Sequence, residues 1–441
     1  MTITRRELLA LLGSAAAGAT IHAQQREQTP IRVGKDLLGV GTGTGSPAPG
    51  DASGQDAFFD DSVLQEIRLE INTKDWETLK ANFQLNDYYP CNMTWRGQTV
   101  GNIGIRSRGT GSRSGVKPGL RVDFDRYTTN KKFLGLKSVI LRNNTQDASN
   151  LHERLSMLLF RRLGVPTSRE AHTRFYVNDQ YAGLYSIVES VDKAFLARNH
   201  GEDSGYLYEY SYPATAAPYY FEDRGSDPAS YDPLPFKPET HETDSRPEYI
   251  VQLVQAINQT SDANFRSAIG EFLDLSKFIK HVAVENYVAD NDGFNGNWGM
   301  NNFYFYRFDN RKLFTFIPWD KSEAFKGGYT YSIWQSITTV SSAQRNRLMG
   351  RVLNYQDLYN LYLDTLIACA DSADDTSGSA NGKIWLENEI QREYDQVRDA
   401  AMADPDKPFT NAQFEQAIND LFVFSHMRSD MVRREVADAR R

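Results

Sequence analysis

The chain has 441 residues, of which 40% are hydrophobic and 24% charged, and this is the composition of a globular protein. Its length allows about two or three structural units. The net charge of −8 and the pI of about 5.5 argue against a nucleic-acid-binding surface. The sequence also lacks an apolar stretch of the roughly 20 residues that a membrane-spanning helix requires.

Residues 1–23 have the layout of an export signal. A pair of arginines, Arg5 and Arg6, precedes a short, weakly hydrophobic segment rich in Ala and Gly, and the small residue Ala23 could end it. The arginine pair indicates the twin-arginine route. We therefore expect a bacterial protein that is exported to the periplasm, the cell surface or the medium. A soluble amphipathic helix is the alternative for this segment.

Residues 24–57 are expected to form a flexible tether between the signal and the folded body. They contain GVGTGTGSPAPGDASG (39–54), which has too little apolar surface to order itself. Folded structure should then begin near Phe58. The two cysteines, Cys91 and Cys369, lie in no metal-binding or redox motif. A disulfide would be compatible with export, but a buried free thiol is the reading favoured for Cys369 in its apolar helical stretch.

Residues 58–190 are predicted to form a sheet-rich unit. VLQEIRLEI (63–71) alternates as a strand does, and Asn72 or Thr73 could cap the short helix that follows. Ile103 and Ile105 share one face of a second strand. GLRVDFD (119–125) also alternates apolar and polar residues. These patterns predict an antiparallel sheet with one buried and one polar face.

A helix and a hairpin complete this unit. LHERLSMLLFRRLG (151–164) carries an apolar face and ends in a glycine placed to stop a helix. RFYVNDQYAGLYSIVES (174–190) predicts two strands that meet at a turn over Asn178 and Asp179.

Residues 191–441 are predicted to be mainly helical. A long surface insertion is expected at 212–247, because Pro, Asp, Thr and Ser are frequent there and periodicity is weak. Two strand-like segments, FYFYRFDN (303–310) and KLFTFIPWD (312–320), interrupt the helical pattern. The fold class is therefore α+β, with a sheet-rich N-terminal part and a mainly helical C-terminal part. A two-lobed nucleotide kinase shows the same order, although likeness of fold alone says little about activity.

The segment DNDGFNGNWGMNNFYFY (290–306) is the main candidate for chemistry. Asp292 and Asn297 lie five positions apart, as the catalytic aspartate and the metal-binding asparagine do in the D-x-x-x-x-N of kinase catalytic loops. Two strands follow, and Asp320 ends the second. Phosphoryl transfer needs an aspartate that bridges to a metal, and Mg²⁺ prefers such oxygen ligands.

Each feature of this segment has a plainer explanation. Runs of Asn, Asp and Gly are usually turns. A calcium-binding EF-hand does not fit, because Gly293 stands at the fourth rather than the sixth position and no terminal glutamate follows. Asp320 alone could cap a helix over 321–326.

Several motifs together resemble the CotH kinase-like family, named for spore coat protein H. The resemblance covers most of residues 63–330, and NDQYAGLYSIVESVDKAFL (178–196) is similar along its whole length. The motifs are IRSRG (105–109), KPGLRVDF (117–124), LKSVILRNNTQD (136–147), LHERL (151–155), GVPTSR (164–169), FYVNDQYAGLYSIVESVDKAFL (175–196), NNFYFYR (301–307) and IPWDKSEAF (317–325).

This resemblance implies an atypical protein-kinase-like fold of two lobes that uses ATP and Mg²⁺, or Mn²⁺, to phosphorylate serine or threonine of secreted or surface proteins. Asp292 would be the catalytic aspartate and Asp320 the metal ligand. Asn297 fits the kinase spacing, but Asn302 of the NNFY string could be the metal-side amide instead. Ser322 stands where the family often has a second aspartate, which could weaken metal binding.

The nucleotide-binding residues are assigned on the same basis. Glu153 of LHERL would pair with a phosphate-binding base, either Arg121 or Lys117, and Arg121 is favoured because it is mid-strand on the polar face. Other expected contacts to the nucleotide are Arg106, Arg108 and Glu189, the last at a hinge position, where a solvent-exposed glutamate is the equal alternative.

Two function classes remain. The first is an exported, ATP- and magnesium-dependent serine/threonine protein kinase. The second is a catalytically degenerate kinase-like module for assembly or surface binding, which Ser322 and the scarcity of ATP outside the cytoplasm favour. A protein partner in the envelope or outside the cell is expected in both cases.

Overall fold

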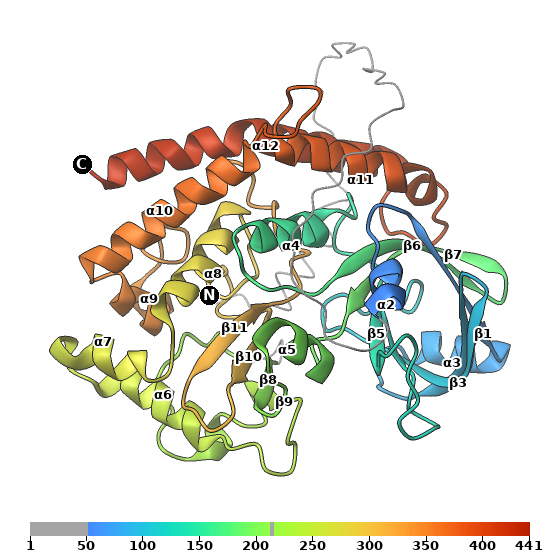
Figure 1. The fold of residues 1–441 in the computed structure, drawn as a ribbon, viewed down its shortest axis with the longest axis horizontal. Helices are drawn as coiled ribbons and strands as arrows, with labels where there is room; N and C mark the ends of the chain where they lie inside the picture. The colour runs from blue at the N-terminus through green and yellow to red at the C-terminus, as the bar shows by residue number, and fades with distance from the viewer. Residues whose placement is uncertain (1–51, 212–215) are drawn as a thin grey trace.

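The computed structural model describes residues 52–211 and 216–441, and it has an α+β fold with two sheets and many helices (Figure 1). The expected signal peptide and residues 24–51 of the expected tether lie outside the described residues. The last part of that tether is helical instead, because α2 (Ala52–Phe58) begins six residues before Phe58. Its end is anchored in the core, where Phe58 packs against Trp95 and Phe133 at centroid distances of 5.2 and 5.8 Å.

Within residues 52–211, seven strands close into a barrel in the order β1-β2-β3-β4-β5-β7-β6. They are β1 (Gln65–Ile71), β2 (Tyr89–Trp95), β3 (Gln98–Ser107), β4 (Leu120–Asp123), β5 (Ser138–Arg142), β6 (Glu170–Val177) and β7 (Gln180–Glu189). The prediction of a wholly antiparallel sheet is wrong, because β1 and β6 pair in parallel. Closing the barrel requires this pair, which brings the first strand beside one that follows a helical crossover.

The local patterns place the inward residues of the barrel. Ile67, Leu69 and Ile71 of β1 are buried and alternate with more exposed residues. Asn72 caps α3 (Thr73–Ala81), since its side chain accepts a hydrogen bond from the backbone of Lys74. The expected turn between β6 and β7 is present. Asn178 and Asp179 have φ values of 49° and 63°, as the type I′ turns of tight hairpins require.

The long helix α4 (His152–Arg162) crosses from β5 to β6. The sequence predicted both this helix and its end at Gly164. Gly164 has a φ of 74°, a left-handed conformation that other residues adopt at a cost. Residues Leu155, Leu159 and Phe160 bury its apolar face in the large helical core. The same helix presents Glu153 and Arg154 at its N-terminal turn, and both are buried.

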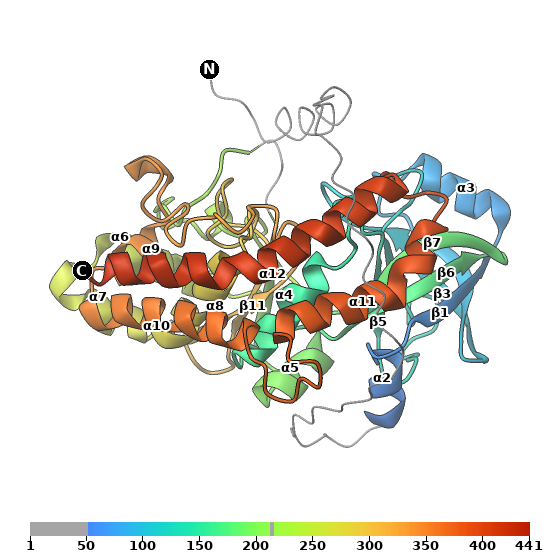
Figure 2. The same ribbon diagram turned by 90° about the horizontal axis from the view of Figure 1, so that it is seen from above.

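The C-terminal part combines a second sheet with helices. The sheet has the order β11-β10-β8-β9, with β8 (Tyr206–Tyr210), β9 (Phe236–Pro238), β10 (Phe303–Arg307) and β11 (Phe314–Pro318). The helices are α5 (Lys193–His200), α6 (Glu248–Gln259), α7 (Asp262–Gly270), α8 (Leu275–Tyr287), α9 (Arg347–Val352), α10 (Gln356–Ala373), α11 (Trp385–Met402) and α12 (Asn411–Ala439), with 3-10 turns η1 (Pro228–Ser230) and η2 (Ser342–Gln344). Figure 2 shows α12 running along α10 and α11, while α11 reaches β7 of the barrel.

The expectation of a surface insertion at 212–247 is wrong for much of this segment. Tyr219, Phe221, Tyr231 and Phe236 are buried in the large core, and β9 pairs with β8. Isolated aromatic residues among Pro, Asp and Ser leave no periodic pattern, so the sequence did not reveal that they anchor the segment.

Both cysteines are buried and free, as favoured for Cys369. Burial raises the pKa of the Cys91 thiol to about 12. In residues 52–211 and 216–441, no helix is long and apolar enough to cross a membrane.

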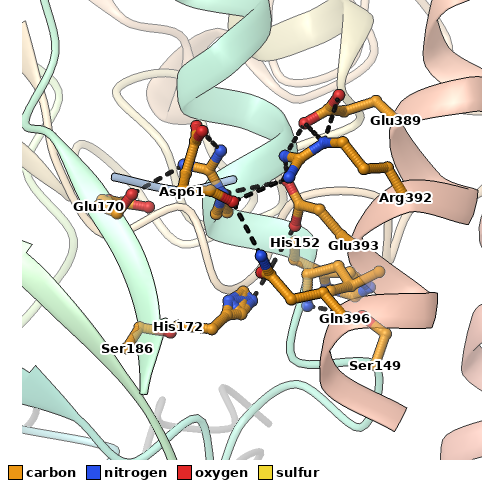
Figure 3. A network of polar contacts seen from close by, with 12 residues as sticks. Asp61, Ser149, His152, Glu170, His172, Ser186, Glu389, Arg392, Glu393 and Gln396 are labelled. Carbon is orange, nitrogen blue, oxygen red and sulfur yellow. Dashed lines mark hydrogen bonds and ion pairs between the residues drawn. The ribbon is translucent and has the colours of Figure 1, made fainter. Parts of the chain in front are cut away.

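A buried polar network joins α11 to α4 and the barrel (Figure 3). The Nε of Arg154 lies 3.1 Å from Glu393 on α11, and its Nη2 pairs with Asp61 in the loop before β1. Glu393 is fully buried, and burial raises its pKa to about 8. His172 of β6 lies 3.9 Å from Glu393, and burial lowers its pKa to about 3.

This network predicts a characteristic dependence of stability on pH. Folded Glu393 keeps a proton that the unfolded chain loses near pH 4.3, so its contribution to stability falls as pH rises from about 5 to 8. The contribution of His172 changes at lower pH. Unfolded His172 binds a proton near pH 6.5 whereas folded His172 does so only near pH 3, so stability falls as pH drops from about 6.5 toward 3.

We expect Glu393→Gln to flatten the fall between pH 5 and 8 by about 1–3 kcal/mol, measured as the free energy of unfolding in urea at several pH values. Glu271→Gln is the matched control, since the Glu271 carboxylate is 60% exposed. Equal slopes for Glu393→Gln and the control would contradict this prediction.

Candidate functional site

A cleft opens beside the N-terminal end of α4, where the ends of β3, β4 and β5 meet the segment after β11. Its wall from Asn143 to Asp147 is rich in amides. The charged residues that line the cleft are Arg108, Arg142, Asp147, Glu153, Arg154 and Asp320. Three of the sequence-predicted site residues, Arg108, Glu153 and Asp320, therefore lie together.

Arg142, at the end of β5, joins two of these predicted residues. Its Nε lies 2.5 Å from Glu153 Oε2, and its Nη1 lies 2.7 Å from Asp320 Oδ2. Arg142 is 8% exposed, and its buried Nη2 has no hydrogen-bond partner within the described part of the chain. The Nη2 of Arg142 is therefore a donor available to an oxygen atom of a ligand. An unmade hydrogen bond is costly in such a desolvated place.

The two carboxyl groups beside Arg142 differ in acidity. Burial alone would raise the pKa of Asp320, but Arg142 outweighs it and holds the pKa below the usual range. Burial raises the pKa of Glu153 well above its usual value, and the nearby Glu170 and Asp320 add to the effect against Arg142. Arg142 thus favours the ionised form of Asp320, whereas burial favours the protonated form of Glu153.

The two bases expected to pair with Glu153 do not do so. Arg121 on β4 contacts Asp123 at 3.3 Å and Ser138 at 3.4 Å. It lies opposite Ile140 in the ladder, two residues or about 7 Å along the strand from Arg142. The polar face was thus assigned correctly, but the partner of Glu153 is wrong.

The side chain of Lys117 is buried between β7 of the barrel and the segment that follows α11. Its Nζ lies 2.7 Å from Asp404 Oδ2 and donates to the carbonyl of Leu184 at 2.8 Å. Asp404 belongs to the connection between α11 and α12. Burial lowers the pKa of Lys117, and Asp404 counteracts it. Lys117 therefore fastens the C-terminal helices to the barrel and does not reach the cleft.

Arg106 and Glu189 also have other partners. Arg106 bonds Tyr88 and Asn86 at 3.2 and 3.1 Å, and it does not line the cleft. Glu189 is 2% exposed and bonds both Arg169 and Arg198. Burial alone would raise the pKa of Glu189, but these arginines lower it. Glu189 is therefore neither exposed to solvent nor free to face a nucleotide at a hinge. Its ion pairs connect the end of β7 to Arg169 and to Arg198 of α5.

The loop before β10 brings Asp292 to Asn302. The Asn302 Nδ2 donates to the backbone oxygen of Asp292 at 2.9 Å and to its Oδ2 at 3.1 Å, and Asn301 donates to the same Oδ2 at 2.9 Å. The carbonyl of Asn302 accepts from the backbone of Trp319, the residue before Asp320, at 3.2 Å. Asn302 therefore connects the loop of Asp292 to the segment of Asp320.

A buried ion cluster fixes this loop from behind. Lys321 Nζ lies 2.5 Å from Glu285 and 2.9 Å from Asp290, and Glu285 also accepts from the backbone of Phe294. Asp290 accepts from the backbone of Asp292 at 3.0 Å, which is the turn-shaping role expected for it. Asn302 and Asp320 have φ values of 56° and 47°, so both are held in left-handed backbone conformations of the kind that cluster at functional sites.

Asn297 lies apart from these contacts. Its Oδ1 accepts from Gln335 at 2.8 Å and Ser336 at 3.0 Å, and its Nδ2 donates to Asn291. The kinase-like spacing thus selects an exposed asparagine that braces the loop against residues 335–336.

Asn302→Ala is therefore expected to lower any phosphotransfer activity about tenfold or more, because it frees Asp292 and loosens the Asp320 segment. Asn297→Ala should change the rate less than threefold. Initial rates at saturating ATP, with Tm as a check on folding, measure both variants, and the reverse order of effects would refute the geometric assignment.

Asp320 and Asn302 carry oxygen atoms of the kind that bind Mg²⁺ in proteins. Among residues 52–211 and 216–441, no group of three or more His, Cys, Asp or Glu side chains is arranged to hold a metal. Mg²⁺, however, is usually held by one or two carboxylates together with substrate phosphates and water. Asp320 offers a carboxylate, and Asn302 offers Oδ1, since its Nδ2 is bound to Asp292.

Ser322 stands where the resemblance predicted a second aspartate. Its hydroxyl donates to Asp320 Oδ1 at 3.0 Å, and His152 Nδ1 lies 3.1 Å from its carbonyl. A serine thus orients Asp320 where a second negative charge was expected.

Arg142 is the site residue that sequence reasoning missed. It lies within LKSVILRNNTQD, but in a fully buried strand whose pattern does not single out one polar residue. The signal that could have found it is an arginine at the very end of an apolar strand, just before the helix of Glu153.

Comparison with known proteins shows which family the chain is similar to. The family described as CotH kinase protein matches residues 105–432. Inner spore coat protein H of Bacillus subtilis (strain 168) is 24% identical over 355 residues, covering 80% of this chain and 92% of that protein. The crystal structure of a Helicobacter pylori proinflammatory kinase, CtkA, matches at 9% identity with a TM-score of 0.29, covering 70% of this chain and 94% of that one.

Proposed function

Because the chain belongs to the CotH kinase protein family, we propose that it is a phosphotransferase that moves the terminal phosphoryl group of ATP to serine or threonine of a secreted or surface protein. The observation that carries this proposal is the Glu153–Arg142–Asp320 arrangement in the cleft. Kinases place a base between a helix glutamate and the nucleotide phosphates, and they hold a metal-binding aspartate next to it.

The roles of the residues follow from their contacts. Arg142 binds phosphate oxygens through its unpartnered Nη2, while Glu153 and Asp320 orient its guanidinium. Asp320 and the Oδ1 of Asn302 would hold a Mg²⁺ or Mn²⁺ ion, which would neutralise charge on the nucleotide phosphates. Asp292 receives the proton of the acceptor hydroxyl at its carboxylate, which Asn301 and Asn302 orient.

The two-lobed arrangement belongs to the same proposal. The barrel of residues 58–190 would act as the N-terminal lobe, and residues 191–441 as the mainly helical C-terminal lobe, with the cleft where β5 and α4 meet Asp320. Export through the twin-arginine route would also be consistent, because that route moves folded proteins and would allow phosphorylation before export.

A non-catalytic assembly or binding module is the second candidate. Ser322 in place of an aspartate favours it, because one negative charge fewer lowers affinity for a divalent cation. The intact contacts of Asp292, Arg142 and Asp320 support the catalytic proposal over this alternative.

The deciding experiment follows radiolabel from the γ-phosphate of ATP. The purified protein is incubated with casein as a generic acceptor and with Mg²⁺, Mn²⁺ or EDTA. Transfer that depends on the metal supports the proposal. No transfer with either metal, from protein that unfolds cooperatively on heating, would overturn it and leave the binding module.

A further inference from the structure

Trp319, the residue before Asp320, contacts two arginines of the cleft. The Cζ of Arg142 lies 4.8 Å from the centroid of its ring, and the Cζ of Arg108 lies 5.1 Å from it. Trp319 is only 3% exposed, and Tyr304 of β10 packs edge-on against it at 5.2 Å. The indole thus packs against the second sheet while two arginines from the barrel part contact its ring.

The two arginines on this ring keep part of their hydrogen-bonding capacity unused. Arg108 has one ion-pair partner among the described residues, Glu209, and that contact is long at 3.6 Å. The buried Nη2 of Arg142 has no hydrogen-bond partner among the described residues, and both arginines line the cleft. Two neighbouring guanidinium groups with an unused donor attract a multiply charged anion.

We propose that Trp319 is a positioning residue that holds Arg108 and Arg142 as a pair, and that this pair receives the polyphosphate chain of the nucleotide. Arg142 ends β5 and Arg108 follows β3, so the two guanidinium groups approach one ring from different segments and each can meet a different phosphate group. Cation–π contact fixes their orientation without consuming their N–H donors. The inference deepens the proposed function and rests on it.

The pair of Arg108 and Arg142 predicts that affinity rises with the number of linked phosphate groups in the ligand. Inorganic tripolyphosphate should bind the protein and compete with ATP, whereas AMP and adenosine should bind much more weakly. Isothermal titration measures these affinities directly and needs no turnover.

Substitution of Trp319 separates its role from a merely structural one. Trp319→Leu removes both cation–π contacts and should weaken tripolyphosphate and ATP about tenfold, while adenosine binding stays unchanged. Trp319→Phe keeps an aromatic face and should remain within about threefold of the wild type. Trp76→Phe is the control, because Trp76 lies on α3, outside the cleft.

The outcomes distinguish the inference from the proposed function. If the wild type binds ATP and Trp319→Leu binds tripolyphosphate equally well, the role of Trp319 is refuted and the kinase proposal stands. If the wild type binds neither ATP nor tripolyphosphate, both are refuted.

Should Trp319→Leu fail to fold, Arg108→Gln is measured in the wild-type and Trp319→Gln backgrounds, because glutamine also removes the aromatic face. Coupling between the two changes supports the pair, and simple additivity refutes it.

Discussion

Asp320→Asn is expected to lower phosphoryl transfer by about 10²–10³-fold, with little change in fold. The substitution keeps the shape of the side chain but removes the ionised carboxylate that faces Arg142 and would hold the metal. Initial rates of transfer from labelled ATP, measured over a range of Mg²⁺ concentrations, give the loss in rate and any weakening of metal dependence.

Two arginines on neighbouring strands provide the sharpest comparison. Arg142→Met should lower transfer about 100-fold, because Glu153 and Asp320 lose their shared partner and the phosphates lose a donor. Arg121→Met should stay within a few-fold of the wild type, since its contacts are to Asp123 and Ser138.

Arg434→Met, at an exposed position of α12, controls for loss of a positive charge. A large effect of Arg121→Met together with a small effect of Arg142→Met would restore the sequence-based assignment and refute the geometric one.

Asp404→Ala is expected to destabilise the protein by about 3–5 kcal/mol, because it leaves the ammonium of Lys117 buried without its counter-charge. Both side chains are 2% exposed, and Asp404 also accepts from the backbone of Leu184 at 3.0 Å. For a protein of this size the loss corresponds to a fall in Tm of roughly 5 °C. Urea unfolding and calorimetry measure it.

The double variant Lys117→Met, Asp404→Leu supplies the control. Replacing both partners by apolar groups removes the unpaired charge, so much of the lost stability should return. ATP affinity should be unchanged in the double variant, since the pair lies outside the cleft. A loss of ATP affinity there would mean that Lys117 acts on the nucleotide after all.

Local structure was largely readable from the sequence. Alternation placed β1 and its buried Ile67 and Leu69, and the cap at Asn72 marked the start of α3. The apolar face of 151–164 predicted α4. These features follow from interactions within a few residues, where side-chain periodicity and backbone preferences decide the outcome.

Packing between distant segments was not readable in this way. The parallel pairing of β1 with β6 closes the barrel, yet each strand alone looks the same in an open antiparallel sheet. The aromatic anchors Tyr219, Phe221 and Phe236 lie in a segment without periodicity, so only contact with the large core reveals that they are buried.

The sequence by itself determined the α+β class, the resemblance to the family and the candidate aspartates, Asp292 and Asp320. Only the tertiary structure decided that Arg142 rather than Arg121 meets Glu153, and that Asn302 rather than Asn297 meets Asp292. Strand alternation fixes which face a side chain takes but not how far along the barrel its partner lies. Which charged residues pair depends on which distant segments pack together. Lys117 and Asp404, for example, are 287 residues apart.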